Sequence, residues 1–301
     1  MKKDLLSILD VQDNIDEILD TAIQMKKQKD KGSKTLRGII LAMIFEKAST
    51  RTRVSFEAGM KRLGGDAIFL GKNDLQLGRG ETIQDTALVL SRYVDVIMYR
   101  AFKSQDIYEL AQYATIPVIN GLDDKEHPCQ VLADFMTIKE KKGELSGLNF
   151  VYVGDGDNNM AHSYLLGCPL TEMNITIVSP HKYWPKPEYV KKAQNLGETR
   201  VEIKENKDNP LKNADIVATD TWISMGDETA KQERINDFQG YTIDTHLMSQ
   251  AKNSAIFLHC LPAYYGKEVT KEVAHGPQSV IFDEAENRLW AQMAIISWLL
   301  D

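Results

Sequence analysis

The chain has 301 residues, which is long enough for two domains. Of these residues 43% are hydrophobic and 26% charged, a composition that excludes a disordered chain. The net charge of −7 argues against a general nucleic-acid or anionic-membrane surface, so any anion site must come from local cations. No apolar run approaches a membrane span, and three cysteines without metal-type spacing predict no disulfide and a cytoplasmic protein.

Short apolar runs alternate with helical patterns along the chain, which predicts an α/β fold. An amphipathic helix is expected at 13–29, where apolar residues recur at helical spacing. Strands are expected at 39–45, 66–70, 94–99, 116–120, 148–153, 175–179, 201–204, 216–219, 255–258 and 280–282, with a closing helix at 284–300.

A polar run at 139–147 separates two series of expected strands and is the predicted domain boundary. The first domain is expected to span 1–142 and to include the returning C-terminal helix 284–301, and the second to span 143–283. Each is expected to be doubly wound around a central parallel sheet, with a hinge between them.

The turn Ser49-Thr50-Arg51-Thr52 follows the first expected strand, and a helix is expected to begin in it. Hydroxyl groups, backbone N–H groups and a guanidinium then converge where the helix dipole is positive, which suits a phosphate. A helix cap whose arginines face solvent is the other interpretation of the same residues.

Three later features of the first half carry similar alternatives. A glycine-containing loop at 71–81 is either functional or a plain surface excursion. Arg100 stands at the end of an expected strand, where parallel sheets bind ligands, although a solvated arginine is also consistent with that position. His127 and Gln130 lie three residues apart at a helix start marked by Pro128, which suits hydrogen bonding to a carbonyl or phosphate, or an ordinary cap.

The second half contains a glycine turn at 154–159 that is similar to the start of a dinucleotide-binding unit. Asn159 replaces the third glycine of the G-x-G-x-x-G pattern, which weakens that interpretation. Two adjacent amides at a helix start instead suit a polar zwitterion, or they cap the helix.

Two later strands are expected to end in polar groups at the same edge of the sheet. The first is followed by Asp220-Thr221-Trp222-Ile223-Ser224-Met225-Gly226, and a charged segment after it would let this loop move as a lid. The second is followed by His259-Cys260-Leu261-Pro262, which presents either a functional thiol or an inert packing cysteine. Arg288 lies near the start of the closing helix.

Together these stretches resemble the aspartate/ornithine carbamoyltransferase family over essentially the whole chain. The turn at 49–52 matches the family's carbamoyl-phosphate signature, and the segment at 127–130 matches its His-Pro-x-Gln segment. The segments at 220–226 and 259–262 resemble the ornithine branch, since aspartate carbamoyltransferases carry a different loop and a Pro-Leu-Pro segment followed by arginine.

The resemblance implies two groups of site residues. Carbamoyl phosphate would be bound by Ser49, Thr50, Arg51, Thr52, Gln76, Arg100, His127, Gln130, Cys260, Leu261 and Arg288. Ornithine would lie between the domains and be bound by Asn159, Asp220, Ser224 and Met225, with Asn158 as a less favoured alternative to Asn159. The catalytic residues implied are Arg100, His127, Asp220, Cys260 and Arg288. Gln76 would act in a neighbouring subunit's site, which implies a homotrimer.

The chemistry fits these residue types. The δ-amine must be neutral to attack, and Cys260 with Asp220 would accept or relay its proton. Donors aimed at the carbonyl would stabilise the oxyanion, and guanidinium groups supply the positive charge, so no metal and no cofactor is expected. The expected product is citrulline, which places the reaction in arginine metabolism. Synthesis and catabolism use the same site.

Three alternatives are weighed against this interpretation. A relative could use putrescine or N-acetylornithine, but the Ser-Met-Gly loop and the chain end at Asp301 favour free ornithine. A nucleotide-binding oxidoreductase built on the glycine turn leaves the segments at 49–52 and 127–130 unexplained. A non-catalytic homologue would be expected to have lost charged site residues that this chain keeps.

Overall fold

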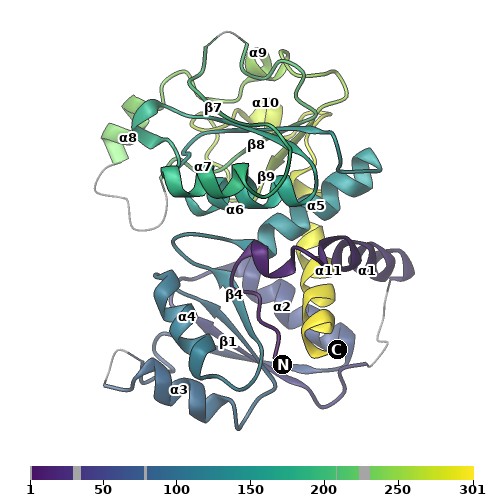
Figure 1. Ribbon diagram of the computed structural model, residues 1–301, viewed down its shortest axis with the longest axis vertical. Helices are drawn as coiled ribbons and strands as arrows, with labels where there is room; N and C mark the ends of the chain where they lie inside the picture. The colour runs from purple at the N-terminus through teal and green to yellow at the C-terminus, as the bar shows by residue number, and fades with distance from the viewer. Residues whose placement is uncertain (1, 30–34, 78–79, 208, 224–230) are drawn as a thin grey trace. The chain divides into compact units, whose positions relative to one another are not determined.

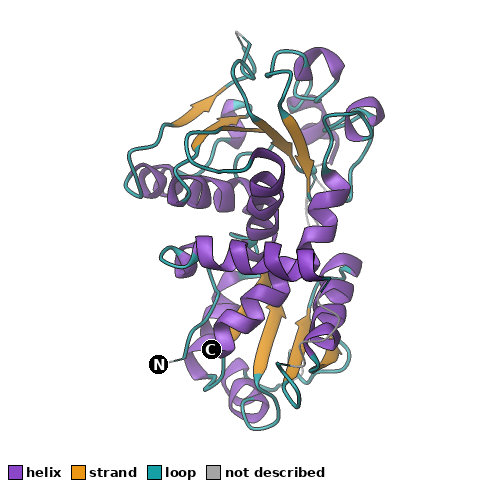
Figure 2. Cartoon of the chain, turned by 90° about the vertical axis from the view of Figure 1, so that its right-hand side faces the viewer, coloured by secondary structure: helices purple, strands orange, loops and turns teal. Residues whose placement is uncertain are grey.

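The computed structural model describes residues 2–29, 35–77, 80–207, 209–223 and 231–301, and the chain divides into two compact units (Figure 1). Unit 1 comprises Met1–Met136 and Glu286–Asp301, and unit 2 comprises Thr137–Ala285. Each unit has a parallel sheet flanked by helices (Figure 2), so the predicted α/β class is confirmed.

Unit 1 is built on the sheet order β2-β1-β3-β4, in which every neighbouring pair is parallel. The strands are β1 (Ile40–Phe45), β2 (Asp66–Gly71), β3 (Val96–Arg100) and β4 (Val118–Leu122). The chain starts in the middle of the sheet, winds to one edge and returns to the other, so the order reverses between β1 and β3. Ligands bind outside the carboxyl ends of strands at such a reversal.

The helices of unit 1 are α1 (Ile15–Gln28), α2 (Thr50–Leu63), α3 (Ile83–Leu90) and α4 (Ser104–Tyr113), with parts of α5 (Pro128–Lys142) and α11 (Ile281–Leu300) and a short 3-10 helix, η1 (Ile8–Val11). Helix α2 packs closely against α11. A Cβ at Gly59 would lie only 3.1 Å from Cγ of Met293, so only glycine fits this contact without a shift of the neighbour. This contact brings the closing helix beside the helix that begins at the Ser-Thr-Arg-Thr turn.

Unit 2 has the sheet order β7-β6-β5-β8-β9, again all parallel, and the order reverses between β5 and β8. The strands are β5 (Asn149–Val153), β6 (Asn174–Val178), β7 (Val201–Lys204), β8 (Ile216–Thr219) and β9 (Ile256–His259). Its remaining elements are α6 (Asn159–Leu170), η2 (His181–Tyr183), α7 (Pro187–Gln194), α8 (Lys231–Asp237), α9 (Thr245–Met248) and α10 (Lys271–Ala274).

The strand expected at 280–282 is wrong. Ser279 makes only an isolated bridge to Phe257, and α11 already begins at Ile281. Asp283 and Glu284 occupy the first turn of α11, where carboxylates interact favourably with the helix dipole. The apolar run therefore starts a helix although its composition resembles a strand.

No helix within the described residues combines the length and the apolar character that crossing a membrane requires.

Candidate active site

The N-terminus of α2 lies at the carboxyl end of β1, beside the end of β3. Ser49 is the N-cap of α2, and its Oγ accepts a hydrogen bond from the backbone N–H of Thr52 at 3.3 Å. The same hydroxyl donates to Oγ1 of Thr52 at 3.0 Å. Phe45 and Arg100 are paired in the register of β1 and β3, so the turn and Arg100 meet where the strand order reverses.

Arg288 reaches this turn from α11. Its Nη2 donates to Oγ1 of Thr52 at 3.1 Å and its Nη1 donates to Oε1 of Gln130 at 2.5 Å. The amide of Gln130 is oriented from its other side as well, since Nε2 donates to Oδ1 of Asp134 at 2.8 Å. All four side chains are buried. The guanidinium is therefore held in one place by residues from α2 and α5.

His127 lies in the field of three arginines. Burial lowers its pKa well below the usual value, and the positive charges of Arg288, Arg100 and Arg51 lower the pKa further. The imidazole is consequently neutral near pH 7, while the guanidinium groups remain charged. Arg51, Arg100 and Arg288 thus form one cationic cluster around His127 in unit 1.

Gln76 is exposed in the loop that follows β2. Ser224 and Met225 lie outside the described residues.

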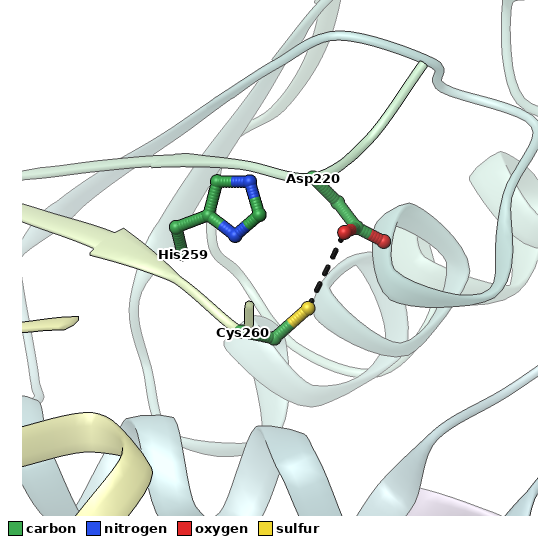
Figure 3. Close-up of side chains that lie close together, drawn as sticks. All are labelled: Asp220, His259 and Cys260. Carbon is green, nitrogen blue, oxygen red and sulfur yellow. Dashed lines mark hydrogen bonds between the residues drawn. The ribbon is translucent and has the colours of Figure 1, made fainter. Parts of the chain in front are cut away.

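In unit 2, Asp220 and Cys260 follow neighbouring strands, and their side chains point toward each other (Figure 3). The thiol of Cys260 donates to Oδ1 of Asp220 at 3.3 Å, and the N–H of Thr221 donates to the same oxygen at 2.7 Å. Burial raises the pKa of Asp220, and the negative charge of Glu268 adds to that rise, while His259 and the two hydrogen bonds oppose it. The carboxyl group is therefore a stronger base than an exposed aspartate.

The glycine turn after β5 is filled by protein. A Cβ at Gly156 would lie 2.8 Å from the carbonyl oxygen of Tyr183 and 2.9 Å from Cδ of Pro185. The glycine is thus required for packing against the segment that follows β6. This close packing disfavours the dinucleotide interpretation, in which a pyrophosphate approaches the second glycine.

Asn158 caps α6. Its Oδ1 accepts from the N–H of Ala161 at 2.8 Å, and its Nδ2 donates to the hydroxyl of Tyr152 at 2.9 Å. Asn158 is buried, whereas its neighbour Asn159 is half-buried. The structure therefore gives Asn158 a capping role.

Arg234 of α8 ties this turn to the segment after β8. It forms an ion pair with Asp155, and its Nε donates to the carbonyl oxygen of Trp222 at 2.6 Å. Burial raises the pKa of Asp155 to about 6, although Arg234 lowers it in part. The residue two positions before Ser224 is thereby fixed to the carboxyl end of β5.

His259 lies beside Asp220 and Cys260 and contacts Glu268, and the sequence analysis did not single out either His259 or Glu268 as functional. Both side chains are fully buried, and Nε2 of His259 lies 3.3 Å from Oε1 of Glu268. In the sequence, only the position of His259 directly before Cys260 indicates that it lies near the site. The residues around Glu268 show no pattern that would predict its position there.

One group of potential metal ligands is found in the described part of unit 2. The ligand atoms of Asp220, His259 and Cys260 lie within 4.8 Å of one another. However, Nδ1 of His259 accepts the N–H of Leu261 at 2.9 Å and Nε2 faces Glu268. A metal would have to replace one of these contacts, so the hydrogen bonds disfavour a metal centre.

These features define an α/β enzyme with a cationic cluster in one unit and a carboxylate–thiol pair in the other. Residues 3–140 match the description "Aspartate/ornithine carbamoyltransferase, carbamoyl-P binding domain", and residues 146–299 match "Aspartate/ornithine carbamoyltransferase, Asp/Orn binding domain". The chain belongs to the aspartate/ornithine carbamoyltransferase family, which confirms the predicted resemblance.

Relatives at high identity match the chain over its whole length. Ornithine carbamoyltransferase of Methanoculleus marisnigri is 51% identical and covers 100% of this chain and 97% of its own. The catabolic ornithine carbamoyltransferase of Thermoplasma volcanium is 49% identical and covers 99% of both chains. The structure of ornithine carbamoyltransferase from Pyrococcus furiosus has a TM-score of 0.93 at 47% identity, covering 98% of this chain and 96% of its own.

Proposed function

We propose that this enzyme transfers the carbamoyl group of carbamoyl phosphate to the δ-amine of L-ornithine and releases L-citrulline and phosphate. The observation that carries the proposal is the cluster of Arg51, Arg100 and Arg288 around a neutral His127. A phosphate and a carbonyl beside it need both charge and oriented donors, which this cluster combines. Full-length relatives that are named ornithine carbamoyltransferase support the choice of reaction.

Unit 1 is proposed to bind carbamoyl phosphate. The phosphate is assigned to Ser49, Thr50, Arg51 and Thr52 at the N-terminus of α2, where the helix dipole favours an anion. The carbamoyl carbonyl is assigned to Arg100, His127 and Arg288, with Gln130 holding Arg288. Because His127 is neutral, it donates a hydrogen bond to the carbonyl without adding a positive charge.

Unit 2 is proposed to bind ornithine. The α-amino and α-carboxylate groups are assigned to Asn159, Asp220, Ser224 and Met225, and the reacting end to Cys260 and Leu261. The capping bonds of Asn158 support Asn159 as the ligand, since both polar atoms of the Asn158 side chain are engaged within the protein.

The chemical step is an attack of the neutral amine on the carbonyl carbon. Asp220, whose pKa is raised by burial, and the thiol that donates to it would accept or relay the amine proton. The oxyanion that forms is stabilised by Arg100, His127 and Arg288. The C–O bond to phosphate then breaks, and phosphate leaves onto Arg51 and the helix N-terminus.

A panel of amines tests the substrate. Purified enzyme is mixed with carbamoyl phosphate and, in separate reactions, with ornithine, putrescine, N-acetylornithine or aspartate, and the ureido product is measured. Ornithine should give citrulline at a rate about 10²-fold or more above the other amines, because a missing or blocked α-group leaves buried polar partners unsatisfied. Faster reaction with another amine would refute the substrate assignment.

The assembly is proposed to be a homotrimer in which Gln76 serves a neighbouring subunit's site. Its exposure in the loop after β2 is consistent with such a contribution. Sedimentation gives the assembly mass directly. In addition, a mixture of the impaired Gln76→Ala and Arg51→Met proteins should be more active than either alone after mild dissociation and reassembly, because some sites then receive both wild-type residues. Mixing that restores no activity would contradict shared sites.

The enzyme is also proposed to work in the cytoplasm. All three cysteines are free, two of them buried and Cys260 half-buried, which is the pattern of a protein from a reducing compartment.

A further inference from the structure

His259 and Glu268 form a buried pair of ionisable side chains beside Cys260. Neither has a part in the proton transfer proposed above. His259 is the last residue of β9, and Glu268 follows it nine positions later. Their side chains are 0% exposed, and Nε2 of His259 lies 3.3 Å from Oε1 of Glu268. Burying a carboxylate is costly, so its retention at this place requires a reason.

Hydrogen bonding determines which imidazole nitrogen carries the proton. The backbone N–H of Leu261 donates to Nδ1 of His259 at 2.9 Å, so Nδ1 presents its lone pair and is unprotonated. The proton of the neutral ring is therefore on Nε2, which faces Glu268. Both ring nitrogens are therefore engaged in hydrogen bonds within the protein.

Glu268 also holds the segment that follows Cys260. Its Oε1 accepts the backbone N–H of Tyr264 at 2.6 Å. On the other side, the backbone N–H of His259 donates to Oε2 of Glu284 at 2.8 Å. The end of β9 and the segment through Tyr264 are thus joined by two buried carboxylates.

These contacts define the position of Cys260. The residue before it is bound through Glu284, and the residue after it is bound through the imidazole. Leu261 has φ of +59°, a left-handed conformation that a residue with a Cβ adopts only when its surroundings hold it there. The thiol lies between these two fixed points, 3.3 Å from Oδ1 of Asp220.

We propose that Glu268 and His259 are positioning residues: Glu268 holds the imidazole in its Nε2–H form, and Nδ1 then holds Leu261 so that the Cys260 thiol points at Asp220. The inference rests on the proposed carbamoyl transfer, in which this thiol and Asp220 handle the amine proton. It assigns His259 no proton transfer of its own.

Two isosteres of His259 separate its two contacts. In His259→Asn the amide oxygen takes the place of Nδ1 and still accepts the N–H of Leu261. In His259→Gln the terminal amide reaches toward Glu268 but offers no acceptor at the Nδ1 position. His259→Asn should keep kcat within about threefold, whereas His259→Gln should lose about 30-fold or more, because only the second releases the thiol. KM for carbamoyl phosphate should not change in either variant.

Glu268 offers a parallel comparison. Glu268→Gln retains an oxygen that accepts from both the imidazole and Tyr264, so it should keep kcat within about threefold, while Glu268→Ala should lose about 30-fold or more. If Glu268→Ala does not fold, the comparison of His259→Gln with His259→Asn still decides the question. Equal losses in both conservative variants, Glu268→Gln and His259→Asn, would indicate proton transfer through the pair and would overturn the positioning role.

A second measurement does not depend on carbamoyl transfer. The rate at which iodoacetamide alkylates Cys260 is followed by peptide mass spectrometry, with the buried Cys129 and Cys168 as internal references. The rate should match wild type in the two conservative variants and change about fivefold or more in His259→Gln and Glu268→Ala, since thiol reactivity depends on its partner and exposure. An unchanged rate in all folded variants would refute the inference, even if the enzyme proved to act on another amine.

Discussion

Arg51 and Arg53 provide a matched pair of variants on one helix. Both are in the first turns of α2, but residues two positions apart on a helix point to different faces. Arg51 is close enough to His127 to lower its pKa, together with Arg288 and Arg100. Arg53 is exposed, stacks on the ring of Phe69 at 3.8 Å and pairs with Glu57 at 3.8 Å. Only Arg51 should therefore matter for the substrate anion.

The expected loss of kcat/KM in an Arg51 variant follows from the contact between the guanidinium and the substrate phosphate that the substitution removes. A charge-assisted contact to a phosphate whose charge increases as the C–O bond breaks is worth about 3 kcal/mol, which corresponds to about 10²-fold in kcat/KM. Arg51→Met should lose about that factor for carbamoyl phosphate. Arg53→Met removes an exposed ion pair and should change kcat/KM by about twofold or less.

The assay measures citrulline formation against carbamoyl phosphate concentration at saturating ornithine, with circular dichroism as the control for folding. Inhibition by inorganic phosphate gives a second measurement, because the product should bind to the same place. Arg51→Met should weaken this inhibition by a similar factor. If both variants keep wild-type kcat/KM and phosphate inhibition, the assignment of the phosphate to the N-terminus of α2 is refuted.

Three further predictions follow from the same structure. Arg288→Lys should lower kcat/KM for carbamoyl phosphate about 10²-fold and the free energy of unfolding in urea by about 2 kcal/mol. The reason is that one ammonium nitrogen cannot take the place of both Nη1 and Nη2, which bind Gln130 and Thr52. Wild-type values in both measurements would contradict the contact. Asp220→Asn should lower kcat/KM for ornithine about 10²-fold and leave KM for carbamoyl phosphate unchanged. Cys260→Ser can still donate a hydrogen bond to Asp220 and should therefore be more active than Cys260→Ala. Equal activity of the two Cys260 variants would show that the hydrogen bond is not needed. Burial raises the pKa of Asp123 to about 6, so its contribution to stability is present below about pH 4 and is lost as the pH rises through about 6. The free energy of unfolding of wild type relative to Asp123→Asn should thus increase by about 1 kcal/mol from pH 7 to pH 5, and a difference independent of pH would refute the shift.

The elements that the sequence predicts well are those whose pattern is local. The run at 39–45 is apolar throughout and forms β1 at Ile40–Phe45, because a central strand is buried on both faces. Ser49 caps α2 as expected, since a cap depends on residues within one turn. The run at 280–282 fails, because three apolar residues suit a strand or a helix start equally, and Asp283 and Glu284 favour the helix.

In the candidate site too, features that depend on local sequence could be predicted, whereas contacts between distant residues could not. From the sequence alone we could infer which chemical groups stand at strand ends and helix starts, and hence the resemblance to the family and the turn that is proposed to bind phosphate. The folded structure was needed to show that Arg288 binds Thr52 across 236 residues and Gln130 across 158, because such contacts depend on how α11 packs on α2 and α5. It also decided that His259 turns its proton toward Glu268, since a tautomer is set by the partners that packing brings to each nitrogen.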